Sequence, residues 1–201
     1  IRYSPITDVK EMPDVDVGLI EGAVGNEENA ENAQVFREKC RTIVALGTCA
    51  CFGGISGLRN LFTRDAVLRR AYVETESTVN GVVPAAVEVP PLTEHVRSLD
   101  QVIPIDYAVP GCPPLPGVIK QTLLALIEGR EPEIASHNLC EECDRVKSKM
   151  LAVSRDYVTD GVVSPHELET IDTRACFLEQ GVLCMGPATR EGCHARCLHG
   201  N

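Results

Sequence analysis

The sequence predicts an α/β protein: a doubly wound parallel sheet followed by a small, irregular region rich in cysteine. Short apolar segments alternate with helical segments over most of the chain, a pattern typical of parallel strands joined by crossover helices. The apolar run "TIVALG" at 42–47 is typical of a strand buried on both faces. After Glu131 the strand character is lost, and cysteines and charged residues dominate instead.

The first strand and the first helix have clear local signals. An apolar strand is expected over 15–20, before a glycine. Asn26 is expected to cap the next helix, because its side chain accepts hydrogen bonds from free backbone N–H groups. Glu27 and Glu28 then fall in the first turn, where the helix dipole favours negative charge. The 42–47 strand follows this helix directly.

The later elements are predicted from glycine, proline and apolar spacing. In chain order we expect a glycine-rich loop at 51–60, a helix at 63–73, a proline-punctuated loop at 79–92, a strand at 101–109 and a helix at 117–128. Gly129 is expected to end the last helix.

A domain boundary is therefore predicted near Gly129. Residues 1–129 form the sheet domain, and residues 130–201 form a second domain with few apolar residues for a core of its own. Such a segment is expected to fold around bound metal centres, whose ligation energy replaces hydrophobic burial.

Composition excludes several classes of function. The chain has 201 residues, with 29 acidic against 19 basic ones and a net charge of -10. Nucleic acids and anionic membrane surfaces require a basic footprint, so neither is expected as a partner. The apolar runs are short and rich in proline, so no membrane span is expected. The first residues also lack the pattern of a signal peptide.

Ten cysteines indicate either a disulfide framework or metal ligation. Disulfide frameworks belong to small secreted chains that cannot build a core, whereas this chain has apolar segments enough for one. Its cysteines occur in "GTCAC", "PGCPP", "CEEC" and "EGCHARC", where glycine and proline let the sulfur approach a bulky guest. Ligation of a metal or cluster is the favoured interpretation.

The cysteines form three sets. Cys49 and Cys112 follow two different strands, where parallel sheets bind ligands, and they could share one guest. Cys140 and Cys143 form a chelating pair, and with two later cysteines they would complete either a zinc tetrahedron or a [4Fe–4S] cluster, which spacing does not separate. The members are, in full, Cys49 and Cys112; Cys140, Cys143, Cys176 and Cys184; and Cys193 and Cys197.

Three such sets on one small chain favour a series of clusters that carry electrons over structural zinc. The two remaining cysteines have blander interpretations. Cys40 is predicted to be a buried or half-buried thiol, since free cysteine behaves as a small hydrophobe. Cys51, two residues from Cys49, is predicted to pack within its loop, with a place beside a cluster as the alternative.

The motifs "ALGTCACFGG", "VPGCPPLPG", "CEEC", "CFLEQGVLCMGP" and "REGCHARC", in this order, resemble the small subunit of [NiFe]-hydrogenases. The similarity is greatest to the cytoplasmic group that includes the methyl-viologen-reducing (F420-non-reducing), sulfhydrogenase and NAD(P)-linked enzymes. The resemblance runs from end to end and implies a flavodoxin-like first domain with a cytoplasmic location.

The resemblance also implies ligands for three [4Fe–4S] clusters in the complete subunit. The proximal cluster would take Cys49 and Cys112 with an N-terminal CxxC pair, and the medial cluster would take Cys193 and Cys197 with a further C-terminal CxxC pair. Neither CxxC pair is present, so we expect the given sequence to be truncated at both termini. The distal cluster would be complete, with the ligands Cys140, Cys143, Cys176 and Cys184.

In function, the resemblance implies a chain that relays electrons from H2 oxidation and contains no catalytic residue and no nickel. The nickel–iron site would lie in a partner large subunit. The acceptor would be a heterodisulfide reductase, a ferredoxin-type subunit or a flavin/NAD(P) module.

Three other classes of protein are weighed against this one. The main alternative is the 20 kDa iron–sulfur subunit of complex I (NADH:quinone oxidoreductase), which shares the "PGCPP" region but should lack the cysteine-rich tail. A flavodoxin-like FMN module and a zinc-stabilised scaffold are the others. Flavin binding does not require ten cysteines, and a zinc scaffold would be colourless with stoichiometric zinc.

Overall fold

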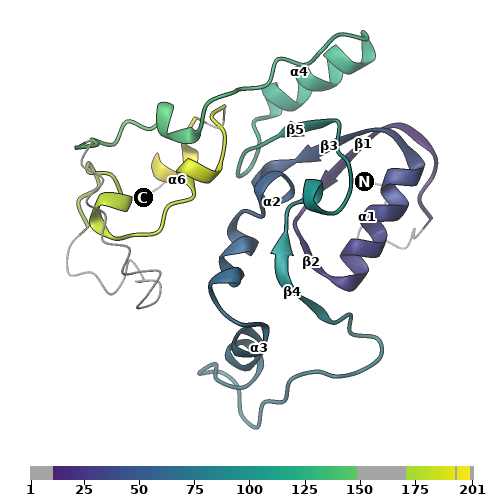
Figure 1. Ribbon diagram of the computed structural model, residues 1–201. Coiled ribbons are helices and arrows are strands. Elements are labelled where there is room, and N and C mark those ends of the chain that lie inside the picture. Colours follow the sequence, from purple (N-terminus) through teal and green to yellow (C-terminus); the bar gives the residue numbers. More distant parts are fainter. Residues whose placement is uncertain (1–10, 149–170, 193, 200–201) are drawn as a thin grey trace. The chain divides into compact units, whose positions relative to one another are not determined.

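The computed structural model describes residues 11–148, 171–192 and 194–199 (Figure 1). The side chain of Cys197 is also outside the description. The chain divides into two compact units, residues 1–110 and 111–201. The predicted domain boundary near Gly129 lies one helix further along the chain and stays a prediction.

The first unit contains a three-stranded parallel sheet with the order β1-β3-β5. Its strands are β1 (Val15–Glu21), β3 (Cys40–Leu46) and β5 (Tyr107–Val109). In the register, Leu46 pairs with Glu21 on one side and with Val109 on the other. All three strands therefore end at one edge of the sheet, and the predicted α/β class with a parallel sheet is confirmed.

Helix α1 (Glu27–Lys39) connects β1 to β3 and begins as predicted. The Asn26 side chain accepts a hydrogen bond of 2.7 Å from the backbone N–H of Asn29. Glu27 and Glu28 lie in the first turn, and basic residues lie in the last. This charge order matches the helix dipole at both ends.

A second, two-stranded sheet pairs β2 (Val24–Asn26) with β4 (Leu92–Arg97) in antiparallel orientation. The sequence analysis missed β4. Thr93, Glu94 and His95 interrupt its apolar pattern, and Val96 is its one buried side chain. A strand held by backbone pairing with so little burial has almost no hydrophobic signal.

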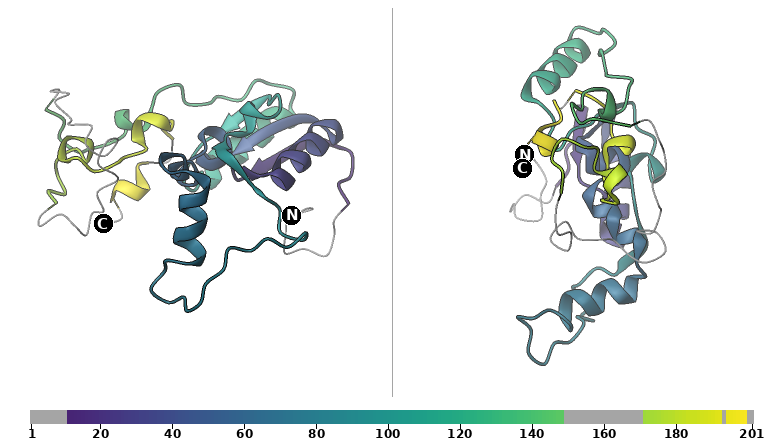
Figure 2. Two further views of the ribbon diagram at one scale, coloured as in Figure 1. Left: turned by 60° about the horizontal axis from the view of Figure 1, so that its bottom comes forward. Right: turned by 90° about the vertical axis from the view of Figure 1, so that its left-hand side faces the viewer.

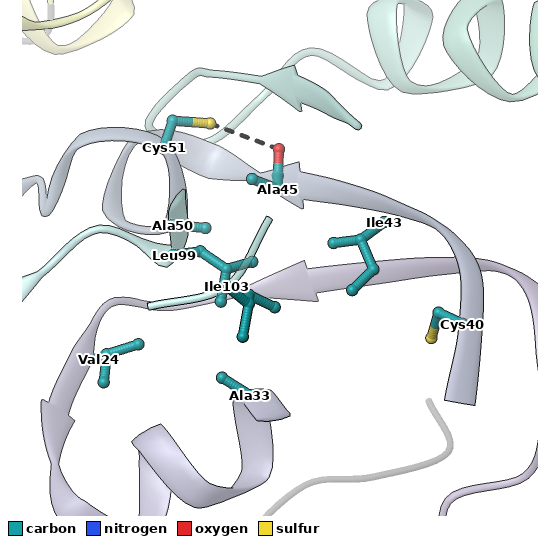
Figure 3. Close-up of a cluster of buried hydrophobic side chains, with 9 residues drawn as sticks. All are labelled: Val24, Ala33, Cys40, Ile43, Ala45, Ala50, Cys51, Leu99 and Ile103. Atoms are coloured by element: carbon teal, nitrogen blue, oxygen red, sulfur yellow. Dashed lines mark hydrogen bonds between the residues drawn. The ribbon is translucent and has the colours of Figure 1, made fainter. Parts of the chain in front are cut away.

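The apolar core of the first unit lies between α1, the sheet and the segment after β4. Figure 3 shows its buried side chains: Val24, Ala33, Cys40, Ile43, Ala45, Ala50, Cys51, Leu99 and Ile103. Cys40 is buried there, as predicted. A Cβ atom at Gly18 on β1 would lie 2.5 Å from the Cys40 sulfur, so only glycine fits opposite this thiol.

After β3 the chain forms three helical segments. They are α2 (Gly47–Phe52), the 3-10 helix η1 (Ile55–Leu61) and α3 (Arg64–Tyr72). Thr63 caps α3 as a side-chain acceptor, so the helix predicted at 63–73 is confirmed. Both views of Figure 2 show α3 and the following loop extending away from the sheet of this unit.

The strand predicted at 101–109 is wrong in its first half. The chain forms the short 3-10 helix η2 (Leu99–Gln101) and a turn before β5 begins at Tyr107. Pro104 lacks an N–H group for the ladder. Asp106 bonds Ile43 of β3 twice, since its carboxylate accepts from the Ile43 N–H at 2.7 Å and its own N–H donates to the Ile43 carbonyl at 3.0 Å.

The second unit begins with Gly111 and contains α4 (Pro116–Ile127), which matches the helix predicted at 117–128. The described residues after α4 are irregular. They form η3 (Leu139–Glu141), η5 (Leu178–Gln180), η6 (Gly186–Ala188), the short helix α6 (Arg196–His199) and two isolated bridges. Buried Leu139 and Ala195 pack with Leu198 as a small apolar cluster.

No helix within the described ranges has the length and apolar character needed to cross a membrane.

Candidate metal centre

Four predicted ligands of the second unit lie near one another. A Cβ atom at Gly186 would lie 3.4 Å from the sulfur of Cys184 and 3.6 Å from the sulfur of Cys140, so these two sulfurs flank one glycine. Cys143 and Cys176 lie near enough for their charges to act on the thiols of both Cys140 and Cys184. All four cysteines are half-buried and free of disulfides. The structure thus brings together the set predicted from sequence.

The electrostatics of this set favour a bound cation or cluster. Burial raises the pKa of the Cys184 thiol most strongly, the Gly186 N–H lowers it, and the other three cysteines raise it further. Burial likewise raises the pKa of Cys140, and Lys147 opposes this effect. If all four thiols lost their protons they would repel one another, and the positive charge of a bound metal centre would offset that repulsion.

The donor chemistry fits an iron–sulfur cluster. Four cysteine thiolates are the ligand set of a [4Fe–4S] cluster, in which each thiolate binds a different iron. Within the described ranges, no three or more His, Cys, Asp or Glu side chains converge closely enough to hold a single metal ion. Gly186 leaves open the space between two of the sulfurs, which a side chain would fill.

The "CEEC" pair is held by local hydrogen bonds. The Asn138 side chain accepts from the Cys140 N–H at 3.0 Å at the start of η3. The Lys147 ammonium donates to the Cys140 carbonyl at 2.5 Å and to the Cys143 carbonyl at 3.1 Å. Both contacts fix the turn on which the two sulfurs lie.

A strand-like seam joins this turn to the segment of Cys176. The Val146 N–H donates to Arg174 at 2.8 Å, and the Cys176 N–H donates back to Val146 at 2.9 Å. The guanidinium of Arg145 lies 3.7 Å from the centre of the Phe177 ring. These contacts place the chain that follows Cys143 beside the segment that contains Cys176.

A second seam joins the turn to the residues beyond Cys184. The Leu139 N–H donates to Thr189 at 2.9 Å, and the Glu191 N–H donates to His137 at 3.0 Å. Asn138 and Arg190 form a bridge between these two bonds. The segment of Cys176 and the segment that follows Cys184 are thus paired by backbone hydrogen bonds with the chain on either side of "CEEC".

Glu142 contacts the backbone on both sides of Cys193. Its carboxylate accepts from the Gly192 N–H at 2.7 Å and from the His194 N–H at 3.0 Å. Cys193 itself and the side chain of Cys197 lie outside the described residues. Their role as medial-cluster ligands stays a prediction.

Cys49 lies on α2, three residues after the end of β3. Gly53 ends this helix with φ 83°, and a Cβ atom at Gly54 would lie 2.8 Å from the Cys49 sulfur and 2.9 Å from its Cα. The neighbouring Cys51 is buried, and its sulfur contacts the Ala45 carbonyl at 3.4 Å (Figure 3). Cys51 therefore packs in the interior as predicted, but it lies on helix α2 and not in a loop.

Cys112 is the second residue of the second unit and is exposed. It follows β5 by three residues, as Cys49 follows β3. A Cβ atom at Gly111 would lie 2.5 Å from Pro114, so glycine is required before this cysteine. A cluster shared by Cys49 and Cys112 stays a prediction.

The sequence analysis missed Lys147 and Glu142, which contact the ligand segments without supplying ligands. Glu142 lies inside "CEEC" and Lys147 follows it closely, but neither has a spacing that marks its role. In the sequence, an acidic or basic residue near a cysteine looks like any other surface residue. Its contacts with the ligand segments become visible only in the folded backbone.

Together, the parallel sheet and the four neighbouring thiols define an α/β protein with a candidate metal centre. The chain belongs to the family of the NADH ubiquinone oxidoreductase 20 Kd subunit, whose model matches residues 1–126.

Individual relatives show which members of this family the chain is similar to. The chain is 40% identical over 201 residues to a subunit of the F420-non-reducing hydrogenase of Methanothermobacter marburgensis, covering 98% of this chain and 63% of that protein. It is 37% identical over 137 residues to the delta subunit of the NAD-reducing hydrogenase HoxS of Cupriavidus necator, covering 66% of each. The resemblance stated from the motifs is confirmed.

A solved structure shows the same fold. A chain of NAD+-reducing [NiFe]-hydrogenase in the H2-reduced state is 38% identical with a TM-score of 0.62, over 65% of this chain and 74% of that one. Over the whole sequence, this chain spans 63% of the length of the matching F420-non-reducing hydrogenase proteins from two Methanothermobacter species.

Proposed function

We propose that this chain is the electron-transfer subunit of a [NiFe]-hydrogenase and relays electrons from H2 oxidation to an acceptor subunit. The observation that carries the proposal is the convergence of Cys140, Cys143, Cys176 and Cys184. Hydrogenase subunits are among its relatives in both sequence and structure. One of them is named as an iron–sulfur subunit of the F420-non-reducing hydrogenase of Archaeoglobus profundus, which supports the type of centre.

The four cysteines would hold the distal [4Fe–4S] cluster, which accepts and releases one electron at a time when bound. The residues of this chain do the rest. Gly186 donates a hydrogen bond to the Cys184 sulfur at 3.4 Å, a contact that stabilises negative charge on a cluster ligand. Lys147 and Asn138 fix the turn of the other ligand pair.

Four further cysteines would serve the proximal and medial clusters. Cys49 and Cys112 would contribute to the proximal cluster, and Cys193 and Cys197 to the medial cluster. Gly54 fits closely against Cys49, so the loop after α2 stays near the edge at which the parallel strands end. This position of Cys49 supports the first assignment. The complete subunit would thus hold three clusters.

The partners follow from the same proposal. A large subunit would contain the nickel–iron site, and this chain would contain no nickel and no catalytic residue. The acceptor would be a heterodisulfide reductase, a ferredoxin-type subunit or a flavin/NAD(P) module. The complex would be cytoplasmic.

The complex I subunit is the second candidate, and the family description supports it. The convergence of four cysteines after residue 139 favours the hydrogenase, because the complex I subunit is expected to lack this tail. The named relatives that extend into this region are hydrogenase subunits.

The test is to purify the protein with its natural partners and to assay iron, acid-labile sulfide, zinc and H2-dependent dye reduction. We expect a brown complex with iron and sulfide in equal amounts and dye reduction under H2. Colourless protein with stoichiometric zinc would refute the proposal. Iron and sulfide with NADH-dependent quinone reduction in place of H2 oxidation would support the complex I candidate.

A further inference from the structure

We propose that Lys147 is a positioning residue of the four-cysteine site, which closes the "CEEC" turn and places a positive charge beside the cluster so that the cluster is reduced more easily. This inference rests on the proposed function, because it requires a cluster at Cys140, Cys143, Cys176 and Cys184.

The first support is the geometry of the ammonium group. Lys147 Nζ donates to the carbonyl oxygens of Cys140 at 2.5 Å and Cys143 at 3.1 Å. These are the backbone carbonyls of the two ligands themselves. One ammonium that bridges them holds the two ends of the chelating turn at a fixed separation.

The second support is the absence of a competing acid among the described residues. The ion pairs found there do not include Lys147. Three acids of this region have other partners: Glu142 accepts from Gly192 and His194, Glu179 accepts from Ser148, and Asp144 pairs with His199. Glu141 is exposed and is in none of these ion pairs. The positive charge of Lys147 therefore stays directed at the ligand turn.

The third support is that the other nearby cation is directed elsewhere. The guanidinium of Arg145 lies against the Phe177 ring and donates to the Leu198 carbonyl. Lys147, in contrast, donates to the backbone of both ligands of the "CEEC" turn. Its positive charge therefore lies beside Cys140 and Cys143.

The consequence is a redox effect. Reduction adds one electron to the centre and makes the site more negative, so a fixed cation stabilises the reduced form. Removing the cation should therefore lower the reduction potential. Since Lys147 is exposed, solvent weakens the effect. We expect a change of about threefold in the reduction equilibrium, which is about 28 mV for one electron at 59 mV per tenfold change.

The experiment is a redox titration of the intact complex monitored by electron paramagnetic resonance. The signal of this site is the one that Cys184→Ser removes. Lys147→Gln removes the charge, and Lys147→Arg keeps it. Lys120→Gln on the exposed face of α4 is the matched control.

We expect Lys147→Gln to lower the midpoint potential by about 28 mV and Lys147→Arg and Lys120→Gln to leave it unchanged. Loss of the signal in Lys147→Gln with retention in Lys147→Arg would also support the role of the charge. An unchanged potential in Lys147→Gln, or loss of the signal in both Lys147 variants, would overturn the inference. A wild-type complex with no iron–sulfur signal would overturn the proposed function as well.

Discussion

At the scale of single residues, glycines lie close to the candidate ligands. A Cβ atom at Gly54 would clash with the Cys49 sulfur at 2.8 Å, and one at Gly186 would lie in van der Waals contact with the sulfurs of Cys140 and Cys184. Neither contact has a spacing signature, although "CFGG" and "CMGP" each place a glycine near a cysteine. The sequence thus identifies candidate ligands but not which glycine each sulfur touches.

Gly54→Ala tests the first contact. Gly54 has φ 54°, and its new Cβ would lie 2.8 Å from the Cys49 sulfur. A left-handed backbone costs an ordinary residue about 1–2 kcal/mol, and the clash adds to this cost. We expect a lower melting temperature of the purified complex and a disturbed environment of Cys49. Gly57→Ala is the control, because nothing lies within 4 Å of a Cβ atom there, and equal melting of both variants would contradict the account.

Asp106→Asn tests the ion pair between Asp106 and Arg37, next to Ile43 of β3. Burial alone would raise the pKa of Asp106, but the Ile43 N–H and the Arg37 guanidinium outweigh it and lower the pKa. A lowered pKa in the folded state means that the stabilisation is present above the ordinary range of an aspartate and is lost as the pH falls through the lowered value. The Asp106 side chain is 42% exposed, so we expect a loss of only about 1 kcal/mol at neutral pH.

Melting curves of the Asp106→Asn variant and the wild type would be compared at neutral and strongly acidic pH. The difference between them should vanish in acid. Asp16→Asn is the control, because Asp16 pairs with Arg41 on the surface and is 87% exposed. A difference that grows on acidification would contradict this assignment.

At the scale of elements, predictions succeed where local chemistry alone sets the structure. Asn26 and the acids after it fix the start of α1, and Gly129 follows the end of α4. They fail for β4, because pairing with β2 and not local sequence makes it a strand. They also fail before β5, where Pro104 and the hydrogen bonds of Asp106 take the place of strand pairing. In the second unit the seams at Val146 and Asn138 are set by tertiary pairing, so sequence periodicity does not reveal them.

Glu142→Ala tests how the turn of η3 supports the segment beyond Cys184. The Glu142 carboxylate binds the N–H groups of Gly192 and His194, and His194 has an unfavourable φ of 56°. Loss of two charge-assisted bonds should weaken this segment by about 1–2 kcal/mol. We expect roughly tenfold faster hydrogen exchange of the backbone amides over 194–199 in the intact complex.

Glu141→Ala is the matched control for this experiment, since Glu141 is the adjacent acid of "CEEC" and is exposed. It should leave exchange over 194–199 unchanged. Equal acceleration by both variants would show that the general charge of the motif, and not the Glu142 contacts, holds the segment.

At the scale of the whole molecule, the two units depend on different sources of stability. The first unit has an apolar core around Ile43 and Leu99, and its class could be predicted from alternating strands and helices. The small cluster of Leu139, Ala195 and Leu198 in the second unit offers little burial. Ligation energy at four cysteines would substitute for such a core. In the irregular region after α4, the cysteine positions were therefore informative and the apolar periodicity was not.

The most direct measurement is a comparison of wild-type and Cys184→Ser complexes, with Cys51→Ser as the control for a buried cysteine that is not a ligand. Iron, sulfide, the resonance spectrum, electron delivery to the natural acceptor and hydrogen–deuterium exchange activity would be measured on each. We predict that Cys184→Ser loses one cluster and most electron delivery but keeps hydrogen–deuterium exchange, while Cys51→Ser keeps all of them. An unchanged cluster content and unchanged turnover with the natural acceptor in Cys184→Ser would contradict the four-cysteine site.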